Sequence, residues 1–126
     1  MFSIPFLLLP AYNEGEVIGQ VIAAVKKEGF EKIIVVDDGS TDDTCQKAKN
    51  AGAIVLRHII NRGKGAAVKS GIEYAKLKKA SIVVTIDSDG QHNPKDIKKL
   101  VEKIREGYDV VLGSRFLNKK NKIPLF

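Results

Sequence analysis

Five short apolar runs alternate with segments of helical periodicity, and this alternation constrains the fold more than any other feature. The runs lack the polar alternation of a half-exposed strand, which indicates strands buried on both faces. They are residues 4–9, 33–36, 54–56, 82–86 and 110–112. A parallel sheet with right-handed helical crossovers buries such strands, so we expect an α/β fold with a mostly parallel sheet and helices on both faces.

The segments between the runs carry helix signals at their ends as well as apolar stripes. Ser40 or Thr41 is expected to cap the second helix, and Asn93 is a candidate N-cap of the fourth, with Pro94 at its first position. Glycines follow the apolar stripes where helices should stop. The four helices are expected at about residues 17–28, 41–51, 66–79 and 94–106.

Polar segments follow three of the strands directly. They are residues 10–14, 37–41 and 87–91. Because ligands of open α/β sheets bind beyond the carboxyl ends of the strands, we expect these segments to meet at one edge and to form a site there.

Asp87 and Asp89 follow the fourth apolar run with one residue between them. Alternation along a strand projects them to the same side, and two like charges that close need a cation between them. With Gln91 as a candidate third oxygen ligand, the set favours Mg²⁺ or Mn²⁺, and such an ion would suit a diphosphate.

Two further segments are candidates for binding a nucleotide. Asp37 and Asp38 could accept hydrogen bonds from a base or a ribose, or could belong to an ordinary turn. Gly63 and Lys64 lie in a glycine-broken basic loop that opens the third helix, where backbone donors and the ammonium could meet a phosphate or sugar. The loop is not a P-loop, because position 58 is His and Gly65 follows the lysine.

The charge balance favours an anionic partner. Lys and Arg outnumber Asp and Glu by 21 to 15, and the excess lies in residues 64–126. Nucleic acid is not expected, because the lysines lie on predicted helix faces with few aromatics among them. Cys45 is the single cysteine, which excludes an intrachain disulfide and fits the cytoplasm. No apolar segment is long enough to span a bilayer.

Two other classes share the acidic motif at residue 87. A calcium loop starting at Asp87 would need Gly where His92 stands and Glu where Lys98 stands. A haloacid-dehalogenase-type phosphatase also has Asp-x-Asp-Gly after a strand, but that class opens its domain with the pair and follows it with Thr or Val, where this chain has Gln91.

Five motifs in order resemble one known family. They are Pro-Ala-Tyr-Asn-Glu at 10–14, Val-Asp-Asp-Gly-Ser-Thr-Asp at 36–42, Asn-Arg-Gly-Lys-Gly at 61–65, Asp-Ser-Asp-Gly-Gln-His at 87–92 and Gly-Ser-Arg-Phe at 113–116. Together they resemble the family 2 glycosyltransferases, and within them the polyprenyl-phosphate sugar transferases such as dolichyl-phosphate mannose synthase and dolichyl-phosphate glucosyltransferase. The resemblance covers residues 4–116.

This resemblance implies a GT-A fold, a UDP- or GDP-linked sugar donor and a polyprenyl phosphate acceptor. It implies that Asp87, Asp89 and Gln91 hold the metal on the diphosphate and that Arg115 adds a cation near the diphosphate or the acceptor phosphate. Asp87, Asp89 and Arg115 are then the candidate catalytic residues. The candidate nucleotide-binding residues are Pro10, Ala11, Tyr12, Glu14, Asp37, Asp38, Gly63, Lys64 and Ser88.

Catalytic domains of this family continue well past the last motif, so we expect residues 1–126 to be a truncated GT-A domain that carries the nucleotide-sugar-binding part. A non-catalytic nucleotide-sugar-binding module or an inactive fragment is the alternative. We expect a cytoplasmic location, and peripheral association with the cytoplasmic face of a membrane and homo-oligomerisation stay open.

Overall fold

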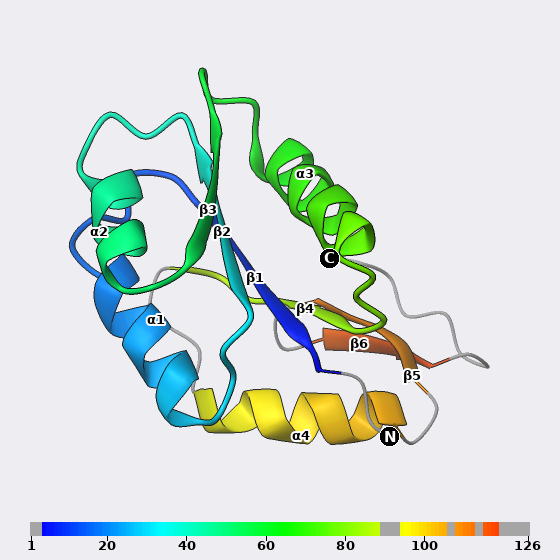
Figure 1. Ribbon diagram of the computed structural model, residues 1–126. Coiled ribbons are helices and arrows are strands. Elements are labelled where there is room, and N and C mark those ends of the chain that lie inside the picture. Colours follow the sequence, from blue (N-terminus) through cyan, green and yellow to red (C-terminus); the bar gives the residue numbers. More distant parts are fainter. Residues whose placement is uncertain (1–3, 89–93, 106–107, 113–114, 119–126) are drawn as a thin grey trace.

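The computed structural model describes residues 4–88, 94–105, 108–112 and 115–118. Figure 1 shows a twisted sheet with helices on both of its faces. In chain order the elements are β1 (Phe6–Ala11), α1 (Ile18–Lys27), β2 (Ile33–Asp38), α2 (Thr44–Asn50), β3 (Ile54–His58), α3 (Lys64–Leu77), β4 (Val83–Thr85), α4 (Pro94–Arg105), β5 (Tyr108–Leu112) and β6 (Arg115–Asn118).

The strand order in the sheet is β3-β2-β1-β4-β5-β6. All neighbouring pairs from β3 to β5 are parallel, which confirms the expected α/β fold. The pairing of β6 with β5 is antiparallel. We did not predict β6, because its four residues, Arg-Phe-Leu-Asn, carry neither a long apolar run nor a turn signal.

The two faces of the sheet are buried by different helices. Leu7 and Leu9 of β1 pack in a core with the buried residues of α1, α2 and α4. Leu8 faces the other way, into a core with Ala67 and Ala75 of α3. Figure 1 shows α3 alone on its side of the strands and the other three helices opposite, so the expectation of helices on both faces is confirmed.

Helix α3 lies very close to the central strand. A Cβ atom added to Gly71 would lie 2.1 Å from Cδ1 of Leu8, so only glycine fits there without movement. Because α3 packs this tightly, its first turn has a fixed place relative to the end of β1.

Several predicted boundaries were wrong by two or three residues. The strand β1 is Phe6–Ala11 where residues 4–9 were expected, the helix α3 is Lys64–Leu77 where about 66–79 was expected, and β5 begins at Tyr108 where residue 110 was expected. The helix α2 begins at Thr44 with no side-chain cap, and Ser40 and Thr41 precede it in a turn. The strand β3 runs to His58, two residues past its predicted end, because its pairing with β2 continues through Asp37↔Arg57 and Asp38↔His58.

The chain changes direction across the sheet at β1. From β1 it moves outward to β2 and β3, and then α3 carries it back to β4 on the other side of β1. Such a switch point leaves a crevice at the carboxyl ends of the two central strands, which is where open α/β sheets bind ligands. In the part of the chain that the structure describes, no helix is both long and apolar enough to cross a bilayer.

Candidate functional site

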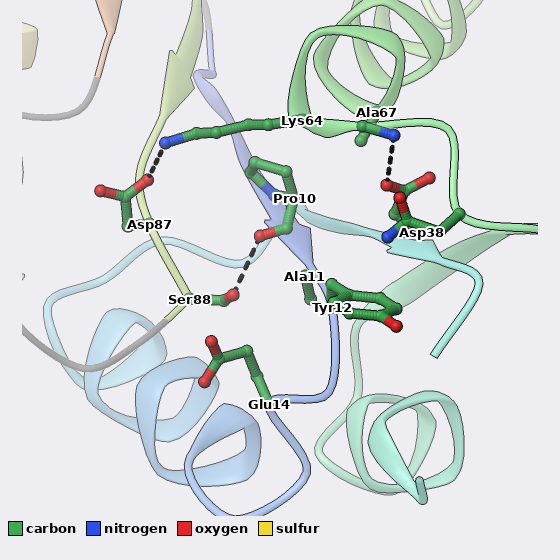
Figure 2. Close-up of a pocket in the computed structure, with 11 residues that line it drawn as sticks. Pro10, Ala11, Tyr12, Glu14, Asp38, Lys64, Ala67, Asp87 and Ser88 are labelled. Atoms are coloured by element: carbon green, nitrogen blue, oxygen red, sulfur yellow. Dashed lines mark hydrogen bonds and ion pairs between the residues drawn. The ribbon is translucent and has the colours of Figure 1, made fainter. Parts of the chain in front are cut away.

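A cleft of about 380 Å³ opens at this switch point, beyond the carboxyl ends of β1 and β4. Figure 2 shows side chains from β1, the end of β2, the start of α3 and the end of β4 around it. The lining residues are Pro10, Ala11, Tyr12, Glu14, Asp38, Asn61, Gly63, Lys64, Ala67, Asp87 and Ser88. For the residues that the structure describes, which exclude 89–91, the expectation that the polar segments after the strands meet at one edge is confirmed.

The cleft gathers all but one of the nine residues proposed from sequence to bind the nucleotide. The exception is Asp37, which faces the opposite side of β2 from Asp38. Its buried carboxylate accepts a hydrogen bond from the Ser40 backbone N–H at 3.0 Å and lies 3.6 Å from Nε of Arg57. The structure thus gives Asp37 a place in the turn after β2, outside the cleft lining.

Two lining residues, Asn61 and Ala67, were not proposed from sequence. Both belong to the basic loop and first turn of α3 that the sequence had singled out around Gly63 and Lys64. A signal was therefore present, but neither a loop asparagine nor a helical alanine carries a chemical pattern that distinguishes it from its neighbours.

The end of β1 is joined to the end of β4 by one hydrogen bond. The hydroxyl of Ser88 donates to the carbonyl oxygen of Pro10 at 2.9 Å, and Figure 2 shows this contact crossing the floor of the cleft. Tyr12 is 46% exposed at the rim, where its ring is available to a planar ligand. Glu14 points toward the same space from the loop that follows β1.

The loop after β1 is fastened to the turn after β2. Asn13 has a left-handed backbone (φ 53°), and its Oδ1 accepts a hydrogen bond from the Thr41 backbone N–H at 2.8 Å. In return, the backbone N–H of Asn13 donates to Oγ of Ser40 at 2.9 Å, and that of Glu14 donates to Oγ1 of Thr44 at 2.9 Å. These bonds fix Tyr12 and Glu14, which flank Asn13 in the chain.

Asp42 completes this junction. Its Oδ2 accepts a hydrogen bond from the Gly15 backbone N–H at 3.0 Å, and its Oδ1 accepts one from the Thr44 backbone N–H at 2.9 Å. The hydroxyl of Thr44, which also donates to Oδ1, lowers the pKa of the Asp42 carboxyl, and the two backbone donors add to that effect. Asp42 thus joins the loop after β1 to the start of α2.

Asp38 is buried under the loop between β3 and α3. Its Oδ1 accepts hydrogen bonds from Nδ1 of His58 and from the Arg62 backbone N–H, both at 2.8 Å, and its Oδ2 accepts one from the Gly63 backbone N–H at 2.8 Å. Burial alone would raise the pKa of this carboxyl, but the hydrogen bonds from His58, Arg62 and Gly63 together outweigh burial and lower it. Asp38 is therefore a carboxylate at neutral pH.

Lys64 and Asp87 form an ion pair across the cleft. Nζ of Lys64 lies 2.5 Å from Oδ1 of Asp87, and Figure 2 shows the lysine side chain reaching from α3 to the end of β4. The side chains are 62% and 40% exposed, so solvent and ligands can reach both of them. The pair thus brings one positive and one negative group together on one side of the cleft.

Of the three proposed metal ligands, only Asp87 lies among the described residues, and its chemistry suits a divalent metal. Asp87 offers an exposed carboxylate at the strand end, the kind of hard oxygen donor that Mg²⁺ and Mn²⁺ bind. The other proposed ligands, Asp89 and Gln91, lie outside the described residues, and the described part of the chain has no cluster of three His, Cys, Asp or Glu side chains for a metal.

Arg115, the third candidate catalytic residue, begins β6. Its backbone pairs with Leu112 at the carboxyl end of β5, which places it at the same edge of the sheet as the cleft. Its position along the sheet is thus compatible with the role expected from the sequence, and that role stays a prediction.

The comparison with protein families decides the assignment. The family model described as glycosyl transferase family 2 matches residues 6–124. The chain belongs to this family. The resemblance read from the five motifs is thereby confirmed, and the haloacid-dehalogenase alternative is left without support.

Known relatives of this family 2 glycosyltransferase chain are longer. An uncharacterised protein of Methanocaldococcus jannaschii is 50% identical over 115 residues, which are 90% of this chain and 47% of that protein. A UDP-N-acetylglucosamine–dolichyl-phosphate N-acetylglucosaminyltransferase of Methanococcus voltae is 35% identical, over 91% of this chain and 53% of that protein. The chain thus spans about half the length of these relatives.

A solved structure supports the same fold. Glucosyl-3-phosphoglycerate synthase of Mycobacterium tuberculosis, crystallised with Mn²⁺ and UDP-glucose, superimposes with a TM-score of 0.70 at 31% identity, over 81% of this chain and 39% of that one. The expected GT-A fold of this family 2 chain is confirmed.

Proposed function

We propose that residues 1–126 form the nucleotide-sugar-binding part of a metal-dependent glycosyltransferase that transfers a sugar from a nucleoside diphosphate to a polyprenyl phosphate. The observation that carries the proposal is the cleft at the switch point, where Asp38, Lys64 and Asp87 come together from three separate segments of the chain. The Methanococcus voltae relative, whose name states a dolichyl-phosphate acceptor, supports the acceptor class.

The cleft has a side suited to the nucleoside and a side suited to the diphosphate. Tyr12 offers a ring for a base, and the loop carrying Asn61 and Gly63 offers backbone groups beside Asp38. Lys64 stands in the first turn of α3, where the helix N-terminus and the ammonium both favour negative charge. We therefore assign the base and ribose to the Tyr12 and Asp38 side and the diphosphate to the Lys64 and Asp87 side.

Asp87, together with Asp89 and Gln91, would hold the Mg²⁺ or Mn²⁺ ion. When bound, the ion offsets the charge that builds on the departing nucleoside diphosphate. We assign a second role to Lys64. Its ammonium pairs with Asp87 in the free chain. With a metal on Asp87, this ammonium would be available to a phosphate oxygen of the donor. Arg115 is assigned to the diphosphate or to the acceptor phosphate, where its planar fork suits two oxygens.

A polyprenyl phosphate needs little activation by the protein. Its attacking oxygen is already anionic near neutral pH, so a dedicated general base is dispensable, whereas a sugar hydroxyl would need one. An acceptor of this kind lies in a membrane, and the proposal accordingly places the chain in the cytoplasm at the membrane face. Of the two donor classes, we propose a uridine nucleotide in place of a guanosine nucleotide.

The proposal is tested by calorimetric titration of UDP and GDP, each with and without Mn²⁺. We expect Mn²⁺-dependent binding of one nucleotide, lost in the Asp87→Ala/Asp89→Ala variant. Asp43→Ala is the matched control, because Asp43 is an exposed carboxylate paired with Lys47 on α2, outside the cleft lining. Absence of binding to the folded wild type, or equal binding by the double variant, would contradict the proposal.

Turnover separates an enzyme from a binding module. Sugar transfer from a labelled donor to a short-chain polyprenyl phosphate, in the presence of Mn²⁺, supports an active transferase. Nucleotide binding without any transfer supports the alternative of a non-catalytic nucleotide-sugar-binding module.

A further inference from the structure

The loop between β3 and α3 forms a wall of the cleft without any apolar anchor of its own. Asn61 and Gly63 line the cleft, yet Ile59 and Ile60 in the same loop are 97% and 68% exposed. Because these two isoleucines bury little apolar surface, other contacts must determine where this wall stands.

Polar contacts from β2 hold the loop from beneath. Both carboxylate oxygens of Asp38 accept backbone N–H groups of the loop, those of Arg62 and Gly63, at 2.8 Å. The neighbouring Gly39 lets the loop approach closely, because a Cβ atom there would lie 2.5 Å from the backbone nitrogen of Asn61. The position of the wall therefore depends on the orientation of one carboxylate.

That carboxylate is in turn oriented by a histidine that is not among the residues lining the cleft. Nδ1 of His58 lies 2.8 Å from Oδ1 of Asp38, and its Nε2 lies 2.8 Å from Oγ of Ser70 on α3. The His58 side chain is only 10% exposed. The chain Asp38–His58–Ser70 thus links β2, β3 and α3 below the loop.

The direction of these hydrogen bonds follows from the chemistry of the groups. Asp38 is ionised and can only accept, so the hydrogen must be carried by Nδ1 of His58. In a neutral ring Nε2 then accepts from the hydroxyl of Ser70. The arrangement requires a hydrogen on Nδ1 of His58, and the hydroxyl of Ser70 can pair with Nε2 either as donor or as acceptor.

We propose that His58 and Ser70 are positioning residues of the nucleotide cleft, which hold the Asp38 carboxylate and through it the loop wall formed by Asn61 and Gly63. The inference rests on the proposed nucleotide-binding function. Neither residue lines the cleft, so both act on nucleotide affinity through Asp38.

Three variants test the proposal. His58→Phe removes both hydrogen bonds, His58→Asn retains a donor near the place of Nδ1, and Ser70→Ala removes the far end of the chain. For the nucleotide that the wild type binds with Mn²⁺, we expect His58→Phe to weaken binding about tenfold, the size of one net hydrogen bond. His58→Asn should recover most of that loss, and Ser70→Ala should weaken binding about threefold. Gln46→Ala, on the exposed face of α2, is the matched control.

A second readout reports on the loop itself, without any nucleotide. Hydrogen exchange of the Arg62 and Gly63 amides should be faster in His58→Phe and Ser70→Ala than in the wild type, and ¹⁵N spectra should show the Nδ1–H form of His58. Unchanged nucleotide affinity in a folded His58→Phe variant, or unchanged exchange of both amides, would overturn the proposal. If His58→Phe does not fold, His58→Asn and Ser70→Ala decide in its place.

The experiments distinguish failure of the proposed nucleotide-binding function from failure of the positioning role of His58 and Ser70. A folded wild type that binds neither UDP nor GDP contradicts the proposed function, and the exchange rates of Arg62 and Gly63 still decide whether His58 holds the loop. Binding by the wild type that none of these variants alters leaves the proposed function intact and overturns the positioning role.

Discussion

Gly71→Ala tests the close packing of α3 on the central strand. The added Cβ would lie 2.1 Å from Cδ1, 2.8 Å from Cδ2 and 3.0 Å from Cγ of Leu8. Leu8 has no exposed surface and stands on β1 between β2 and β4, so its side chain has no open space to move into. Either Leu8 leaves its rotamer or α3 moves away from the sheet.

The size of the effect follows from two opposing terms. Overpacking of a well-filled core costs about 1–3 kcal/mol, and contacts this short place the cost near the upper end. Replacing glycine by alanine inside a helix raises the free energy of unfolding by about 1 kcal/mol. We therefore expect the free energy of unfolding to fall by about 1–2 kcal/mol, measured by urea denaturation.

Gly19→Ala is the matched control, because Gly19 lies inside α1 and a Cβ atom there meets no atom within 4 Å. It keeps the helix-propensity gain and lacks the clash, so it should raise the free energy of unfolding by about 0.5–1 kcal/mol. A Gly71→Ala variant that is as stable as the wild type, or as stable as Gly19→Ala, would refute the reasoning.

Three further predictions concern the loops and charges of the cleft. The pKa of Asp42 is lowered in the folded chain from its ordinary value of 3.8, so its contribution to stability is present above that pH and is lost as pH falls through the folded pKa. Asp42→Asn should therefore lower the free energy of unfolding at pH 7 and much less at pH 3 in urea titrations, and an equal loss at both pH values would contradict this. Lys64→Gln should weaken nucleoside diphosphate binding about three- to tenfold in calorimetry and reduce its salt dependence, since one exposed cation is removed, whereas unchanged affinity would show that Lys64 is not near the phosphates. Asn13→Ala should lower the melting temperature more than Asn13→Gly. Both variants lose the hydrogen bonds to Oδ1, but only alanine is strained by the positive φ at this position. The reverse order would disprove that the left-handed backbone matters.

The parallel sheet could be predicted because each strand is buried on both faces and is therefore a continuous apolar run. The local sequence pattern did not predict elements whose position depends on contacts between residues distant in sequence. Ser40 and Thr41 look like helix caps, but they bind the backbone and side chain of Asn13, so α2 starts later. The strand β6 forms only because β5 offers it an edge to pair with.

The site could be predicted in outline for a similar reason. Polar residues directly after parallel strands must meet at the carboxyl ends of those strands. This rule correctly predicted that Asp38 and Asp87 lie in one site. The alternation of β2 separates the two adjacent aspartates, since Asp38 continues the face of Ile34 and Val36 toward α3, and Asp37 continues the face of Val35. The bond from His58 to Asp38 depends on the register of β3 against β2, and the sequence does not reveal that register.

The most direct test of the proposed donor site is paramagnetic broadening of backbone amides by Mn²⁺, with and without the nucleotide that binds. We expect nucleotide-dependent broadening centred on Asp87, Ser88 and Lys64, while the amides of Gly29 and Gly52, which precede β2 and β3 at the amino ends of the strands, stay sharp. Broadening centred elsewhere, or the same pattern with and without nucleotide, would contradict the claim that this cleft holds a metal-bound nucleoside diphosphate.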